Sequence, residues 1–309
     1  MGSKENRKPI LVISFCLELI WGYLNTGNQN MIRRLKEDET AGRGTIKALL
    51  KLLEAFEIPV TWAVVGHLFL DRCEKVEGVP HPDMPRFKDN WYELDPCTDI
   101  GRDPLFYGKD LIEQILSSKV KHEIGYHSFS HVIFPLATLE VAEAEIAKGV
   151  EIAQKEFGLK LKSFIFPQNK IAHLELLEKY GFVAFRGENV WEKTRRNSSS
   201  LLWRTLSSIR SSIAIGPISP CRVGGLLNIP TSMLFDTFRP LPSSLLFGLY
   251  GLYKTLRKNK VFHISSHPES FIRNPTLKNQ FKSFLFVVSR LRDRGLLEVS
   301  TMGNLAKVF

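Results

Sequence analysis

The chain has 309 residues, of which 44% are hydrophobic, so it is long enough to bury a full core and need not contain more than one domain. Its 42 lysines and arginines outnumber 32 acidic residues, and the net charge of +10 attracts phosphates, nucleic acid and anionic lipid surfaces. No zinc-finger spacing, RNA-binding aromatic run or long basic stripe accompanies this charge, so nucleic acid is not an expected partner. No apolar stretch reaches the roughly 20 residues that span a bilayer, so no membrane span is expected.

The predicted elements alternate between strands and helices along the chain. Hydrophobic runs typical of buried strands cover residues 9–17, 58–65, 121–126, 162–166, 182–186, 225–231 and 260–265. Helix-patterned segments cover residues 45–56, 138–157, 173–180 and 277–292. This alternation predicts an α/β fold with a parallel sheet and outer helices, and seven strands favour a barrel whose functional groups lie at the C-terminal ends of the strands.

One long segment interrupts the alternation after the second strand. Residues 73–108 contain five prolines and are too long for an ordinary connection. We expect them to form a lid or a substrate-selecting wall over the active face. Asp95, Asp99 and Asp103 within this segment are expected to be solvated loop residues.

Two features bear on where the protein works. The four cysteines have no C-x-x-C spacing, and the N-terminal apolar run is too short for a signal peptide, so we expect a cytoplasmic protein. Residues 245–253 are apolar and precede a basic run, KTLRKNK. They are expected to form either a packed helix of the barrel or a surface that rests on a membrane carrying a lipid-linked sugar.

Two histidines after the third strand suggest a metal site. His127 and His131 are four residues apart, so both imidazoles would project from one face if the chain turns helical after Gly125. Glu18 ends the apolar run of the first strand, where a buried charge is costly unless it is paired or coordinated. Two imidazoles and a carboxylate form a three-ligand set that leaves a zinc ion one open position. The spacing of the histidines alone also fits ordinary core or surface residues.

Several motifs occur in an order typical of one known family. EIGYHSFSH at residues 123–131 contains a pair of the form H-S/T-x-x-H. The others are ISFCLELIWG (13–22), PVTWAVVG (59–66), SFIFPQN (163–169), FRG (185–187) and HISSHP (263–268). Together they resemble the polysaccharide deacetylase family, also called NodB homology or carbohydrate esterase family 4. The resemblance covers nearly the whole chain and implies a single domain over residues 1–309, folded as a distorted (β/α) barrel of about seven parallel strands.

The resemblance also implies roles for matched residues. Glu18, His127 and His131 match the metal ligands, and zinc is the expected ion. His267 matches the late histidine that acts as general acid. The family's general base is an Asp two positions before the acidic ligand, where this chain has Cys16.

Other residues are expected to line the substrate site or to lie beneath it. Pro167, Gln168 and Asn169 stand in the family's substrate loop, and Trp21 and Trp191 are expected either to stack on a sugar or to pack in the core. His263 shares a strand face with His267 and is expected one layer deeper, as a packed histidine.

A second departure accompanies Cys16. The family's substrate loop carries an Arg that orients the catalytic Asp, whereas this chain has Ile165 and Gln168 at those places. A guanidinium with no carboxylate to hold would be an unpaired cation, so the base and its tether are expected to be lost together.

Three functions are compatible with these residues. The preferred one is a metal-dependent hydrolase that removes an acetyl or formyl group from the amine of a sugar nucleotide or lipid-linked saccharide in glycan biosynthesis. Loss of a positioned base costs about 10²–10⁴ in rate, which slows such an enzyme without abolishing its activity. The alternatives are a pseudoenzyme that binds a saccharide or a partner protein, and an enzyme with Cys16 as nucleophile, although a thiol at the end of a core strand is more often inert.

Overall fold

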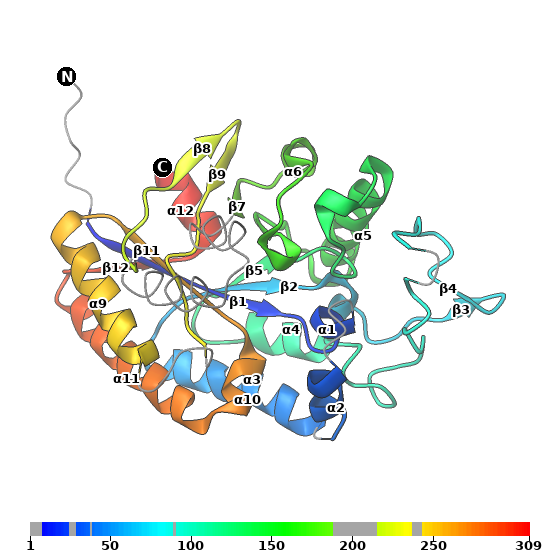
Figure 1. Cartoon of the computed structure of the whole chain (residues 1–309), viewed down its shortest axis with the longest axis horizontal. Helices are drawn as coiled ribbons and strands as arrows, with labels where there is room; N and C mark the ends of the chain where they lie inside the picture. Colours follow the sequence, from blue (N-terminus) through cyan, green and yellow to red (C-terminus); the bar gives the residue numbers. More distant parts are fainter. Residues whose placement is uncertain (1–7, 25–28, 38, 89–90, 188–214, 237–242) are drawn as a thin grey trace, which may run out of the picture.

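A computed structural model describes residues 8–24, 29–37, 39–88, 91–187, 215–236 and 243–309 (Figure 1). Trp191 lies outside the described residues.

A strongly curled sheet forms the centre of the molecule (Figure 1). Its strand order is β10-β11-β1-β2-β5-β6-β7-β9-β8, with β12 also paired to β1, and every pairing is parallel except that of β8 with β9. The strands are β1 (Ile10–Leu17), β2 (Thr61–Val64), β5 (Glu123–Tyr126), β6 (Ser163–Ile165), β7 (Ala184–Arg186), β8 (Cys221–Val223), β9 (Leu226–Asn228), β10 (Met233–Leu234), β11 (Val261–Ser266) and β12 (Glu298–Ser300). All seven predicted strands are present, and the expected distorted barrel of mostly parallel strands is confirmed.

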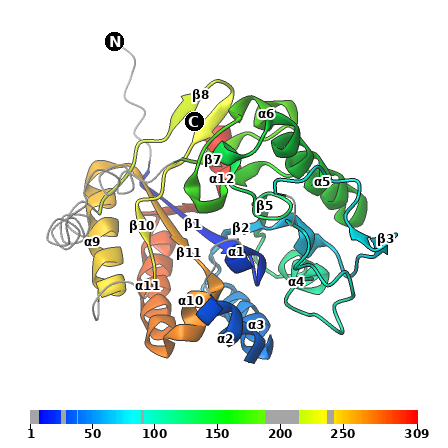
Figure 2. The same ribbon diagram turned by 45° about the vertical axis from the view of Figure 1, so that its right-hand side comes forward.

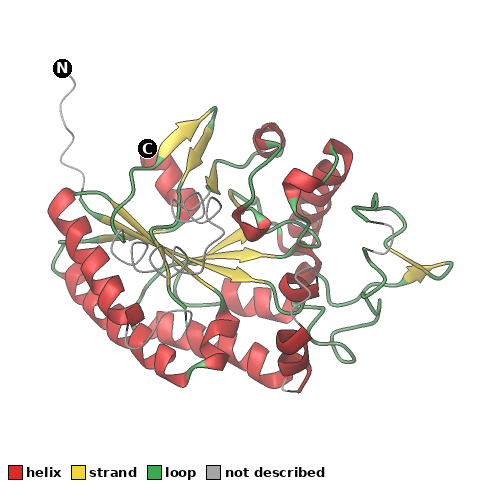
Figure 3. Ribbon diagram, in the orientation of Figure 1, coloured by secondary structure: helices red, strands yellow, loops and turns green. Residues whose placement is uncertain are grey.

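Helices cover the outside of the curl (Figures 2 and 3). They are α1 (Trp21–Leu24), α2 (Gln29–Glu37), α3 (Glu39–Ala55), α4 (Lys109–Leu116), α5 (Leu139–Phe157), α6 (Leu174–Lys179), α9 (Ser243–Lys258), α10 (Pro268–Arg273), α11 (Pro275–Asp293) and α12 (Met302–Val308). Short 3₁₀ turns η1 (Gly66–Phe69), η2 (Phe134–Leu136) and η3 (Pro167–Asn169) follow β2, the loop after β5, and β6. The four predicted helices correspond to α3, α5, α6 and α11.

Strand β1 shows how the two faces of the sheet differ. All eight of its residues are buried, and side chains alternate between the two faces of a strand. Leu11, Ile13 and Phe15 pack in the large core beneath the helices. Val12 and Cys16 face the inside of the curl, in a smaller core shared with β2, β6, β7, β9 and β11. Cys16 therefore lies inside the barrel.

Helix α12 closes the end of the barrel opposite the predicted site. Its residues Met302 and Leu305 belong to the smaller core. The backbone N–H of Met302 donates to Thr61 Oγ1 at 2.9 Å, and that of Gly303 donates to Glu123 Oε2 at 2.9 Å. Because Thr61 and Glu123 begin β2 and β5, the polar groups that remain inside the barrel lie toward the C-terminal ends of the strands.

The segment after β2 carries a short hairpin, β3 (Lys75–Val76) and β4 (Val79–Pro80), which extends away from the sheet at the right of Figure 1. The expectation that Asp95 is a solvated loop residue is wrong, since its side chain is buried. Two histidines contact its carboxylate, and such contacts offset the cost of burying a charge. Asp99 is 44% exposed, as expected.

None of the helices in the described part of the chain is long and apolar enough to cross a membrane.

The packing of α5 against β5 gives the first prediction. A methyl group at Gly149 would overlap the ring of Tyr126, which is fully buried and donates to the carbonyl of Glu145. We expect Gly149→Ala to destabilise the protein by about 1–3 kcal/mol through overpacking. Gly44→Ala is the matched control, because a methyl there meets no atom within 4 Å and alanine favours a helix by about 0.5–1 kcal/mol. Urea unfolding measures both, and equal stability of the two variants would contradict the packing argument.

Candidate active site

The loop that follows β5 carries the two predicted histidine ligands. The expected helical turn is absent, because residues 127–131 are irregular and Ser128 and His131 have left-handed φ angles of 61° and 64°. Such conformations cost on the order of 1–3 kcal/mol each in non-glycine residues. The two imidazoles still meet, with ring centroids 4.9 Å apart. A strained loop, and not a helix face, brings them together.

Hydrogen bonds from two elements, α5 and η1, hold this loop. The buried carboxylate of Glu145 on α5 accepts from the Ser130 N–H at 2.8 Å and from the Ser130 hydroxyl at 2.6 Å. The N–H groups of Gly66 and His67 on η1 donate to the carbonyls of Ser128 and Phe129 at 2.7 and 2.9 Å. These bonds offset the backbone strain and fix the direction of both imidazoles.

Glu18 lies directly after β1, and one of its oxygens is the meeting point of the site. Glu18 Oε1 lies 3.1 Å from His127 Nε2, 3.7 Å from His131 Nε2 and 3.5 Å from His267 Nε2. On the other side the carboxylate packs against Gly22, where any Cβ would overlap Oε2. The structure thus brings together Glu18, His127, His131 and His267 from β1, the loop after β5 and the end of β11.

The donor set of Glu18, His127 and His131 fits a divalent cation. His127 Nδ1 lies 2.6 Å from the carbonyl of Ile165, which can only accept, so Nδ1 carries a proton and Nε2 points at Glu18. Metal-binding histidines typically make this second bond to a carbonyl. The three ligand atoms lie within 4.8 Å of one another and all three residues are buried. A cation bound by Glu18, His127 and His131 would replace the proton that otherwise lies between the His127 imidazole and the Glu18 carboxylate.

The charges around Cys16 are unusual for a core thiol. Burial disfavours a thiolate, but the charge of Arg186 and the charge and hydrogen bond of His127 lower the pKa of Cys16 well below its usual value. Burial likewise opposes the imidazolium, yet the negative charge of Cys16 raises the pKa of His127 to about 9. Burial is not offset at His131, and it lowers the pKa of that imidazole to about 4.

The expectation that the tether of the base is lost is wrong. Arg186, the last residue of β7, points inside the barrel and its Nη2 donates to Cys16 Sγ at 3.3 Å. Its Nε donates to Asn169 Oδ1 at 2.8 Å. Ile165 and Gln168 do lack a guanidinium, but the neighbouring strand supplies one. Cys16 therefore has a fixed cationic partner.

His263 and His267 occupy different depths, as predicted. His263 is completely buried, with Nε2 2.9 Å from Ser14 Oγ, and burial lowers its pKa to about 3. The His267 side chain is 30% exposed and the side chains of Glu18, His127 and His131 are 7% exposed or less. His267 and His127 both lie within 3.5 Å of one Glu18 oxygen, far inside the about 10 Å reach that an acid role allows. Because burial is outweighed by the charges of Glu18 and Cys16, the pKa of His267 is raised well above its usual value.

The residues expected to bind substrate differ in how far they are exposed to solvent. Gln168 is exposed and Asn169 is partly buried, both with left-handed φ angles, beside the buried Pro167. Trp21 is only 2% exposed, its Nε1–H donates to the Phe106 carbonyl at 3.1 Å, and it packs on His67. That burial leaves no ring face for a sugar, which corrects the stacking role and leaves Trp21 as a core residue.

Two residues that lie at the site, Arg186 and Glu269, were not identified from the sequence. Arg186 belongs to the FRG motif, but its reach to Cys16 joins residues 170 positions apart. Glu269 lies two residues after His267, is buried, and has its pKa raised to about 8 by burial and by the charge of Glu18. A charged residue directly after HISSHP was the one available signal for it.

Comparisons with known proteins agree with this geometry. The model of the family described as polysaccharide deacetylase matches residues 37–184. No curated protein matches the chain significantly.

Solved structures share the fold at low sequence identity. A protein of Mycobacterium smegmatis classed with the polysaccharide deacetylases has a TM-score of 0.64 at 15% identity, over 99% of this chain and 92% of its own. The allantoinase Puue has a TM-score of 0.61 at 12% identity, over 98% and 91%. A Pseudomonas aeruginosa PAO1 protein, also classed with the polysaccharide deacetylases, has a TM-score of 0.59 at 11% identity, over 98% and 91%.

The family match spans the His127–His131 motif, and the shared fold extends over almost the whole chain. The match to the polysaccharide deacetylase family covers residues 37–184, a little under half of the chain.

Proposed function

We propose that the protein is a metal-dependent hydrolase that removes an N-acetyl or N-formyl group from a sugar intermediate of glycan or polysaccharide biosynthesis. The family that residues 37–184 match is described as polysaccharide deacetylase, and removal of an N-acyl group hydrolyses a carbon–nitrogen bond other than a peptide bond. The observation that carries the proposal is the convergence of three imidazoles on Glu18 Oε1, at 3.1 to 3.7 Å, with only His267 substantially exposed. Two of these imidazoles suit metal binding and the third faces the solvent.

Glu18, His127 and His131 would hold the ion, and zinc is preferred because this nitrogen and oxygen donor set suits it. When bound, zinc polarises an acyl carbonyl and makes water easier to deprotonate. The chain must supply a base, an acid and a means of orienting both.

His267 is proposed as the acid that protonates the departing amine. The negative charges of Glu18 and Cys16 favour its protonated form, and its exposed edge can reach a substrate. Cys16 is proposed as the base, because Arg186 favours its thiolate and fixes its direction. Arg186 also bonds Asn169 in the proposed substrate loop, so sugar binding and the base share one guanidinium.

The proposed substrate is a sugar nucleotide or a lipid-linked saccharide in a reducing cytoplasm, since all four cysteines are free. The membrane alternative is supported by one face of α9. Leu246, Tyr250 and Tyr253 on this face are 58%, 47% and 53% exposed. Lys254 and Arg257 lie over the two tyrosine rings. An apolar helix face flanked by basic residues suits peripheral contact with an anionic membrane.

A saccharide-binding protein with little turnover is the second candidate. It is favoured by the presence of Cys16 where the family has its Asp, because a thiolate of low pKa is a weak base. The measured rate of the unaltered protein decides between the two.

The proposed metal site predicts that loss of one ligand lowers the amount of bound metal. We expect His131→Ala to lower the content of bound divalent ion by about one equivalent, since two remaining ligands hold zinc poorly. Elemental analysis of protein supplied with zinc and then gel-filtered measures this. His173→Ala, a partly exposed histidine before α6, is the control and should leave the content unchanged. Equal metal content in the two variants would rule out this ligand set.

The proposed role of Cys16 as the base predicts that a stronger base at this position increases activity. We expect Cys16→Asp to raise the rate of acetate or formate release from N-acylated sugar nucleotides by up to about 10²–10⁴, because Arg186 would hold a fully ionised carboxylate. Cys221→Asp, at an exposed thiol on β8, is the matched control and should have no effect.

Two outcomes would redirect this assignment. If Cys16→Asp destroys activity while zinc is retained, the thiol acts covalently and the base role is wrong. If only the Cys16→Asp variant releases an acyl group, the natural protein is a binding protein.

A further inference from the structure

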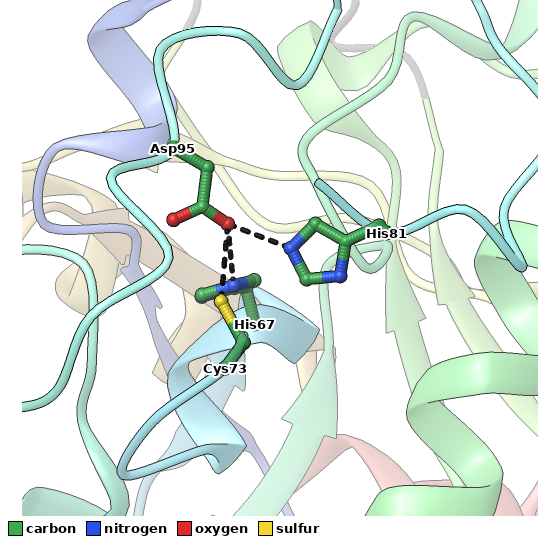
Figure 4. Close-up of side chains that lie close together, drawn as sticks. All are labelled: His67, Cys73, His81 and Asp95. Carbon is green, nitrogen blue, oxygen red and sulfur yellow. Dashed lines mark hydrogen bonds and ion pairs between the residues drawn. The ribbon is translucent and has the colours of Figure 1, made fainter. Parts of the chain in front are cut away.

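A second cluster of ligand-type side chains lies outside the Glu18 site. Figure 4 shows His67, Cys73, His81 and Asp95 turned toward one another. His67 lies on η1 after β2, and the other three come from residues 73–108. One ligand atom from each of the four lies within 4.8 Å of every other.

The cluster is centred on Asp95 Oδ2. This oxygen lies 2.9 Å from His67 Nε2, 2.6 Å from His81 Nε2 and 3.6 Å from Cys73 Sγ. Ligands of a tetrahedral zinc ion, each about 2.0–2.3 Å from the metal, lie roughly 3.3–3.8 Å apart. The three distances to Asp95 Oδ2 are thus at or shorter than this spacing, and the other pairs of ligand atoms lie within 4.8 Å. His67 and Asp95 are 1% exposed or less.

The tautomer of His67 argues for a cation. His67 Nδ1 lies 2.9 Å from the carbonyl of Phe106, which only accepts, so Nδ1 carries the proton. In a neutral ring, Nε2 then has no proton, and its lone pair faces the Asp95 carboxylate. His67 Nε2 is buried and makes no hydrogen bond of acceptable geometry, although Asp95 Oδ2 is 2.9 Å away. Two acceptors in contact need a positive charge between them.

The surroundings of Asp95 orient it as a ligand. Its other oxygen, Oδ1, accepts from the backbone N–H of Cys97 at 3.0 Å, so Oδ2 is left to the cluster. Bonds of this kind outside the ligand shell are typical of metal sites. A cavity bordered by Cys73, His81 and Phe129 lies beside the cluster and gives an ion a path inward.

We propose that His67, Cys73, His81 and Asp95 bind a structural zinc ion that anchors residues 73–108 to the barrel. The set supplies two imidazoles, one thiolate and one carboxylate, all donors that zinc accepts, and it fills four positions. With the Cys73 thiol deprotonated, the two negative ligands balance the charge of the ion, so the buried site is neutral. Binding releases the thiol proton to solvent and involves no redox step.

This site is distinct from the Glu18 site. The ring of Trp21 packs on His67, with centroids 4.4 Å apart, and Trp21 itself lies three residues after Glu18. No residue belongs to both ligand sets. Substitutions in one ligand set can therefore remove its ion without touching a ligand of the other ion.

The test uses full-length protein purified in reductant, supplied with zinc and gel-filtered. We expect about two equivalents of zinc in the natural protein, and about one in each of Cys73→Ser/His81→Ala and His131→Ala, because Cys73→Ser alone would leave two imidazoles and a carboxylate. The triple variant should hold none. After replacement of zinc by cobalt(II), a thiolate-to-cobalt charge-transfer band should appear in the near ultraviolet, persist in Cys16→Ala and Cys221→Ser, and vanish in Cys73→Ser.

The cobalt spectrum decides the matter even if Cys73→Ser does not fold. A natural protein without a thiolate band, or a band that Cys16→Ala removes, would overturn the proposal. So would a single zinc equivalent that is lost in His131→Ala, because His67, Cys73, His81 and Asp95 would then be a metal-free hydrogen-bonded network.

Discussion

The buried charge of the Glu18 carboxylate determines which side chains must surround it in the site. It stands at the end of a strand whose eight residues are all buried, so its charge must be balanced inside the barrel. The balance comes from imidazoles on the loop after β5 and at the end of β11. In the sheet β11 is next to β1, and β5 lies on the other side of β1, beyond β2. A parallel sheet makes this possible, because the carboxyl ends of its strands share one edge.

The interior of the barrel changes character along its axis. Near α12 it is apolar, with Val12 and Met302 in the smaller core. Further along, Ser14 bonds His263 and receives Arg186 Nη1 at 3.5 Å, and Cys16 follows on the same face. Cys16 is therefore supported by a buried polar layer that includes the guanidinium of Arg186. A charged side chain in such a position rigidifies its neighbours, since moving it would expose an unpaired group.

The fold was predictable from the sequence to a large extent, and the site only in part. Continuous apolar runs revealed all seven strands, because each is buried on both faces. Motif order singled out Glu18, His127, His131 and His267, which the structure places side by side. Spacing could not reveal the left-handed turns at Ser128 and His131, which depend on bonds from Glu145 and η1.

Arg186 and Asp95 were misjudged for a related reason. The partners that bury them lie far away in the sequence or in another segment, as Arg186 and Cys16 illustrate. The loop after β5 is in turn joined to the long segment, since Trp91 Nε1–H donates to Ser130 Oγ at 2.8 Å and Tyr92 donates to Glu145 at 3.1 Å. Exchange of this segment for another would thus remove one bond to the histidine loop and one bond to the carboxylate that holds this loop, so a change in the long segment would also be felt at His127 and His131.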